Sequence, residues 1–189
     1  MTRIRNTKRI CLAATVALAM VGLARTSQAA ATVQQEAQLI SEAQRTVDLY
    51  RKTDPGIDAF FNRSVGYVVF PGIGKGGLGI GGAHGNGVLF DKAGKPVGKV
   101  TMNQVTVGAQ AGGQEFSQII FFETPIVLNE LKMDKTKFSA EVSAVALSSG
   151  AAAKARFTNG VAVFTAAKGG LMFEASIGGQ KFKYQPFTM

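Results

Sequence analysis

The chain has 189 residues, of which 46% are hydrophobic and 17% are charged, and this composition excludes a disordered or collagen-like protein. Its 21 Lys and Arg against 12 Asp and Glu give a formal net charge of +9. So much positive charge on a folded domain would indicate a nucleic-acid or anionic-membrane partner, so its distribution along the chain matters.

Residues 1–30 have the pattern of a secretory signal peptide. Basic residues precede the apolar run 10–23, and small residues follow at 27–31, at the spacing of a cleavage site. The run is shorter than the roughly 20 residues of a membrane-spanning helix, which favours cleavage over a retained anchor. Cleavage would remove five of the 21 bases and no acid, lowering the net charge from +9 to +4. We therefore expect no nucleic-acid partner, and export to the periplasm or envelope, or secretion.

The next segment has the periodicity of an amphipathic helix. Apolar residues recur every three or four positions from Val33 to Tyr50, and Thr32 with Gln35 fits a capping box. The opposite face carries three acids and three bases, whereas a membrane-surface helix is enriched in Lys and Arg. This pattern predicts a helix that packs on a core and exposes a solvated face.

The rest of the chain predicts β-structure around one short helix. Residues 65–70 are rich in β-branched and aromatic side chains, 119–122 are apolar on both faces, and 171–184 read as a closing hairpin. Thr124-Pro125 predicts the start of a short internal helix. We expect an α+β fold in one domain, 31–189: a mainly antiparallel, strongly curved or barrel-like sheet of seven or eight strands, with the N-terminal helix and the internal helix.

Between Gly72 and Gly87, nine of sixteen positions are glycine. Gly72, Gly74 and Gly77 match G-x-G-x-x-G, but a dinucleotide site needs a helix next, and each Gly costs a helix about 1 kcal/mol relative to Ala. Nucleotide binding is therefore not expected. The structural interpretation is that these glycines permit positive φ, bulges and close strand approaches in a curved sheet.

A functional interpretation of the same tract stays open. Residues 70–78 would form an adaptable apolar loop that enters a lipid headgroup layer, while lysines of the following hairpin meet phosphates. Four lysines at roughly 1 kcal/mol each would hold a peripheral protein on an anionic surface. The candidate lipid-binding residues are Phe70, Pro71, Ile73, Lys75, Leu78, Lys92, Lys95 and Lys99.

Four stretches together resemble the SYLF domain family. They are Phe70-Pro71 with the glycines that follow, residues 81–89, residues 108–114 and residues 168–180. The resemblance implies an exported bacterial lipid-binding module, with eukaryotic relatives that bind phosphoinositides and, in some cases, actin filaments. The balanced charge of the N-terminal helix counts against transferring those two properties. Phe164-Thr165 stands where many relatives have Tyr-Ser, which counts against transferring a role for that hydroxyl. Actin binding is not expected.

Few residues carry chemistry. The single cysteine, Cys11, lies within the predicted signal peptide at the start of its apolar run, so lipidation is not indicated, and the exported chain would lack a thiol. His84 is the one histidine, and no Gly-x-Ser-x-Gly elbow occurs. A carboxylate pair stays open, although nothing in the spacing of Glu115 and Glu123 selects it. We expect no enzyme activity, no metal and no cofactor.

The sequence thus favours a non-enzymatic, phospholipid-binding envelope protein that associates peripherally with membranes. Two alternatives remain: a structural or partner-binding envelope protein, and an integral outer-membrane β-barrel. The absence of Trp and the presence of only three Tyr argue against the barrel, because such proteins carry aromatic girdles.

Overall fold

The computed structural model describes residues 31–136, 143–168 and 179–187. The chain divides into two units, one ending at Gln38 and one beginning at Leu39. The first contributes helical residues 31–38, and the second holds every other element described below. The predicted signal peptide, residues 1–30, lies outside the described residues.

The predicted N-terminal helix is confirmed and spans residues 31–53. It is followed by a 3-10 turn, η1 (Pro55–Ile57), and by α2 (Asp58–Arg63). Between the N-terminal helix and η1, the buried Asp54 accepts hydrogen bonds from the Gly56 N–H at 3.1 Å and from the Ala152 N–H at 2.7 Å. Because Ala152 lies in the second 3-10 turn, η2 (Ala151–Ala153), this carboxylate joins the end of the helix to a segment much later in the chain.

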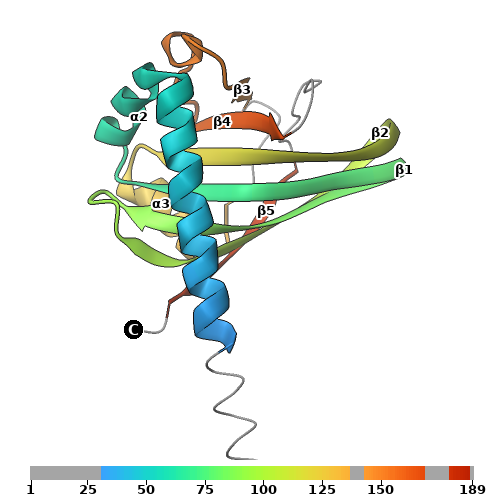
Figure 1. Cartoon of the computed structure of the whole chain (residues 1–189), viewed down its shortest axis with the longest axis horizontal. Helices are drawn as coiled ribbons and strands as arrows, with labels where there is room; N and C mark the ends of the chain where they lie inside the picture. Colours follow the sequence, from blue (N-terminus) through green and yellow to red (C-terminus); the bar gives the residue numbers. More distant parts are fainter. Residues whose placement is uncertain (1–30, 137–142, 169–178, 188–189) are drawn as a thin grey trace, which may run out of the picture. The chain divides into compact units, whose positions relative to one another are not determined.

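Two long strands dominate the sheet: β1 (Gly66–Asp91) and β2 (Pro96–Phe122), which extend together beyond the other strands (Figure 1). They pair antiparallel from Gly66 opposite Phe122 to Phe90 opposite Pro96, with three register shifts. Several strands predicted separately are therefore parts of one hairpin. The turn that joins its two arms spans residues 92–95.

Three shorter strands complete the sheet in the described residues. β4 (Val161–Lys168) pairs antiparallel with residues 115–122 of β2, and β5 (Lys181–Pro186) pairs antiparallel with residues 98–103. β3 (Ala144–Ala146) runs parallel to β4. The strand order is β1-β2-β4-β3, with β5 paired to β2.

The sheet is buried on both faces around residues 119–122 of β2. On one face, Ala43, Val47 and Tyr50 of the N-terminal helix pack with α2 against β1, β2 and β4. The opposite face is covered by α3 (Pro125–Lys132), whose Leu131 is fully buried. The Thr124 hydroxyl caps α3 by accepting from the Val127 N–H, as the Thr-Pro signal predicts. A strand covered on both faces explains why 119–122 is continuously apolar.

The glycine tract lies within β1, so the prediction of a loop over residues 70–78 is wrong. Its glycines allow close approach between two parts of the same strand. A Cβ atom added at Gly87 would lie 2.6 Å from the Val69 carbonyl oxygen, and one at Gly85 would lie 2.9 Å from that of Gly72. Real Cβ atoms essentially never come so close, so these positions exclude any side chain.

The α+β class, with a mainly antiparallel sheet, is confirmed. The sheet is neither closed nor strongly curled, so the strongly curved or barrel-like form is not confirmed. Of the predicted closing hairpin, 171–184, residues 171–178 lie outside the described residues. Among the helices that the structure describes, none has the length and apolar character needed to cross a bilayer.

Candidate functional site

The structure separates the eight predicted lipid-binding residues into buried and accessible groups. Phe70 and Ile73 have 0% exposure, and Pro71 is also buried, all within β1. Phe70 and Ile73 belong to the core that α3 covers. These three side chains are buried within β1, so the prediction that they enter a headgroup layer as an exposed loop is wrong.

The remaining predicted residues differ in position as well as in exposure. Lys75 is half-buried in β1, and Lys99 is half-buried in β2 at the register position of Val88 and Gln185. Leu78 belongs to β1, but its side chain lies outside the described residues. Among the predicted residues whose side chains the structure describes, only Lys92 and Lys95 are exposed, and both belong to the β1–β2 turn.

The β1–β2 turn is held by one carboxylate. Asp91 accepts hydrogen bonds from the N–H groups of Ala93 and Lys95, each at 2.9 Å. Gly94 occupies the left-handed region with φ +78°, a conformation that costs a residue with a Cβ about 1–2 kcal/mol. The backbone of the turn is therefore fixed, and it presents two ammonium groups to solvent.

Beside this turn lies a pocket of about 330 Å³. The N-terminal helix, α2, β1 and the turn all contribute to its walls. Its apolar floor consists of Val47, Phe61, Tyr67 and Phe90, and its polar rim includes Gln44, Asp48, Arg51, Asn62 and Lys92. The volume is at the low end of the range for ligand sites, so it suits a headgroup or another small molecule and not a whole phospholipid.

Aromatic contacts preorganise the floor of the pocket. The Tyr67 ring stacks on Phe90 with centroids 5.2 Å apart and meets Phe61 edge-on at 4.8 Å. The Arg51 guanidinium lies 4.3 Å from the centroid of the Phe61 ring, and its Nε donates to the Asp58 carboxylate at 2.8 Å. The ring faces at the floor are thus largely covered by other groups of the protein, and Arg51 is held by the Phe61 ring and the Asp58 carboxylate.

The Tyr67 hydroxyl is the titratable group at the floor. Burial has the largest effect on the pKa of Tyr67 and raises it. The positive charge of Arg51 lowers this pKa and the negative charge of Asp91 raises it, and the net result is a pKa above the ordinary value. The hydroxyl therefore keeps its proton at neutral pH and is available as a hydrogen-bond donor. A Cβ atom at Gly94 would lie 3.5 Å from the hydroxyl oxygen, which places the turn directly beside it.

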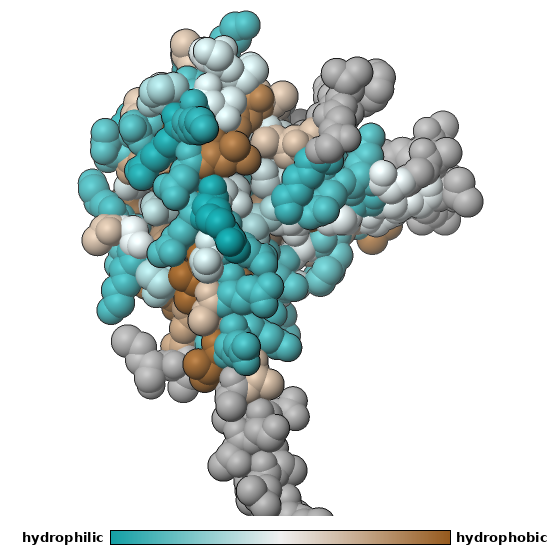
Figure 2. All heavy atoms as spheres, in the orientation of Figure 1, coloured by the Kyte–Doolittle hydropathy of each residue, from teal (hydrophilic) through white to brown (hydrophobic). Residues whose placement is uncertain are grey.

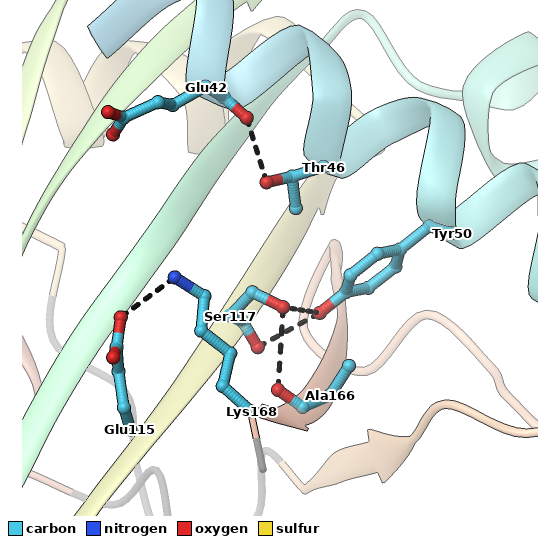
Figure 3. A network of polar contacts seen from close by, with 7 residues as sticks. All are labelled: Glu42, Thr46, Tyr50, Glu115, Ser117, Ala166 and Lys168. Carbon is cyan, nitrogen blue, oxygen red and sulfur yellow. Dashed lines mark hydrogen bonds and ion pairs between the residues drawn. The ribbon is translucent and has the colours of Figure 1, made fainter.

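A second polar cluster on the same face of the sheet is closed (Figure 3). The buried Tyr50 hydroxyl donates to the Ser117 carbonyl at 2.9 Å, and the Ser117 hydroxyl donates to the Ala166 carbonyl at 3.4 Å. Burial raises the pKa of Tyr50, and its hydrogen bonds lower it by less. The hydroxyls of Tyr50 and Ser117 are thus hydrogen-bonded within the protein, and the cluster joins the N-terminal helix to β2 and β4.

The carboxylates and the histidine that the sequence left open have structural partners. Glu115 pairs with Lys168 at 2.7 Å, and Glu123 pairs with Arg63 at 2.7 Å, so the two carboxylates are not paired with each other. His84 Nδ1 lies 2.8 Å from the Asn103 Oδ1 on the neighbouring strand. In the described parts of the chain, no group of three or more His, Cys, Asp or Glu is placed to hold a metal ion.

The surface around the pocket is mainly polar. On the face shown in Figure 2, the visible apolar residues form small separate patches among hydrophilic ones. The large exposed apolar side chains of the described residues come from three places: the N-terminal helix (Val33 and Leu49), β2 (Val105), and α3 with its C-cap (Ile126 and Met133). Scattered residues of this kind are normal on a protein surface and do not form an insertion site.

Sequence reasoning found Lys92 but missed the pocket that it lines. Arg51 looked like one of the solvated charges of the helix, and Tyr67 looked like a strand residue. The balanced acid and base content of the helix is the one signal that pointed away from a purely basic surface. In the comparisons with known proteins, no family model and no curated protein matches the chain.

Proposed function

We propose that this chain is a non-enzymatic phospholipid-binding protein of the bacterial cell envelope, of the SYLF type, that attaches peripherally to anionic membranes. The attachment is made by the β1–β2 turn and not by the glycine tract. The observation that carries the proposal is the pair of exposed lysines, Lys92 and Lys95, beside a pocket large enough for a headgroup.

The electrostatics of the turn support this mode of binding. Each lysine close to an anionic leaflet contributes roughly 1 kcal/mol, and the attraction falls off within a Debye length of about 8–10 Å. The backbone of the turn is fixed by Asp91, so both ammonium groups reach the surface from one rigid site. The half-buried Lys75 and Lys99 lie within strands and contribute less.

The test is sedimentation of the purified protein with vesicles of phosphatidylglycerol and phosphatidylcholine, and with phosphatidylcholine alone. The double variant Lys92→Gln/Lys95→Gln should bind the anionic vesicles about thirtyfold more weakly, because two lysines contribute about 2 kcal/mol. Raising the salt concentration should weaken the wild type more than the variant.

The matched control is Lys132→Gln/Lys135→Gln, which removes the same charge from two exposed positions at and just after the end of α3. Because α3 covers the opposite face of the sheet, this variant should bind as the wild type does. Equal weakening of both double variants would show that net charge and not the turn drives binding. Failure of the wild type to sediment with either vesicle would reject lipid binding.

A further inference from the structure

The pocket is lined by charges of both signs. Asp48 and Arg51 both come from the N-terminal helix, three residues apart and so on neighbouring positions of one face. Lys92 comes from the turn, and Asp58 is bonded to Arg51 at 2.8 Å. The lining therefore holds one carboxylate and two cations. Because Asp58 already offsets the charge of Arg51, Asp48 and Lys92 remain as charges of opposite sign for a ligand.

A ligand that carries both signs of charge matches this arrangement. Its anionic part would contact Arg51 and Lys92, with the protonated Tyr67 hydroxyl as a further donor. Its cationic part would contact the exposed carboxylate of Asp48. All four groups line one pocket of about 330 Å³, which is the size of a site for a small molecule.

The aromatic floor indicates which kind of cation fits. Quaternary ammonium groups are bound by the open faces of several aromatic rings. Here Arg51 already covers Phe61, and Tyr67 is stacked on Phe90. A primary ammonium group, which donates hydrogen bonds to a carboxylate, is therefore favoured over a quaternary one.

We propose that this pocket binds a zwitterionic phosphate ester of a primary amine, the chemistry of phosphoethanolamine, with Arg51, Lys92 and Tyr67 on the phosphate and Asp48 on the ammonium group. The inference rests on the proposed function for its lipid source. The same chemistry occurs in a free phosphoethanolamine molecule and in a phosphatidylethanolamine headgroup, and the two sources are separated in the experiment.

The first arm is calorimetric titration of the purified protein with phosphoethanolamine, phosphocholine and inorganic phosphate. Phosphoethanolamine should bind at least about tenfold more tightly than either of the others, as expected for a hydrogen-bonded charge that the others lack. Equal affinity for inorganic phosphate would overturn the role of Asp48. Tighter binding of phosphocholine would overturn the choice of a primary amine.

Variants assign the contacts. Asp48→Asn should lower the affinity for phosphoethanolamine to that for inorganic phosphate, while Glu130→Gln, an equally exposed acid on α3, should not change it. Lys92→Gln and Tyr67→Phe should each weaken the binding of both phosphoethanolamine and inorganic phosphate. Asn62→Trp, at an exposed rim position, should obstruct the pocket and abolish binding with little change in the melting temperature. Normal titration of this last variant would place the ligand elsewhere.

The second arm uses vesicles that contain equal phosphatidylglycerol and either phosphatidylethanolamine or phosphatidylcholine. Preference for the ethanolamine vesicles, lost in Asp48→Asn, would assign the pocket to the membrane lipid. If the protein bound phosphoethanolamine but no vesicles, the proposed function would be rejected and the pocket would be assigned to a soluble ligand. If the protein bound vesicles but none of the three soluble probes, the pocket would be rejected as a ligand site and the turn would remain as the attachment site.

Discussion

The glycine tract and the β1–β2 turn both contain glycine and lysine within one hairpin, yet they use them in opposite ways. In the tract, Gly87 gives space, because backbone and ring atoms occupy the place of its missing side chain. In the turn, Gly94 is needed for its conformation, with φ +78°, and an added Cβ would make only an ordinary contact of 3.5 Å with the Tyr67 hydroxyl. Lys75 of the tract is half-buried, whereas Lys92 of the turn is exposed. Glycine content alone therefore does not distinguish a core strand from a binding loop.

The largest expected effect is that of Gly87→Ala. The new Cβ would lie 2.6 Å from the Val69 carbonyl oxygen and 2.7 Å from the Phe70 ring, so backbone must move. Overpacking of this kind should lower the free energy of unfolding by about 3 kcal/mol, measured by denaturant titration. Gly74→Ala is the matched control, because nothing lies within 4 Å of its added Cβ. A similar loss in both variants would contradict the close-approach explanation.

A smaller effect is expected at Gly94. Alanine there is strained by the positive φ and not by contact, so Gly94→Ala should cost about 1–2 kcal/mol of unfolding free energy. Gly94→Asn should cost less than alanine, because Asn tolerates the left-handed region. At Gly87 the larger Asn should instead be worse than Ala. The stabilities are measured by thermal and denaturant unfolding. If the Ala and Asn variants ranked in the same order of stability at both positions, the two glycines would not differ in the way proposed, with Gly87 needed for space and Gly94 for its backbone conformation.

The burial of Tyr67 in the pocket beside the turn should also affect how the free energy of unfolding changes at alkaline pH. The raised pKa of Tyr67 means that the folded chain keeps this proton when the unfolded chain has released it, above its ordinary pKa of about 10. The unfolded state then binds fewer protons, so the free energy of unfolding falls as pH rises through that value. Tyr67→Phe has no proton to release there and should show a shallower fall. An unchanged slope would mean that Tyr67 ionises alike in both states.

The smallest expected effect is that of Lys75→Gln. Lys75 is half-buried on β1, within the tract that the structure assigns to the sheet, and so it should contribute little at a membrane surface. Binding to anionic vesicles should stay within about twofold of the wild type, against about thirtyfold for the turn variant. A loss in Lys75→Gln that equals the loss in the turn variant would restore the tract as a membrane contact.

Local signals predicted the elements whose causes are local. The helical periodicity up to Tyr50 and the Thr124-Pro125 start of α3 both correspond to helices. The role of the glycine tract was not predictable in this way, because the partner of Gly87 is a carbonyl eighteen residues earlier in the chain. The pocket depends on Arg51 and Lys92, which only the tertiary fold brings together.

β2 is the common partner of three strands, and this has a consequence for how the chain reaches its native state. One edge of β2 pairs with β1, but its other edge pairs with β5 and β4, which are made later. During synthesis, that edge of β2 therefore keeps unpaired backbone amide groups until β4 and β5 are made, and another chain could add a strand to it. Pausing the chain before β4 emerges should favour aggregation, and a holdase that covers the waiting edge should suppress it.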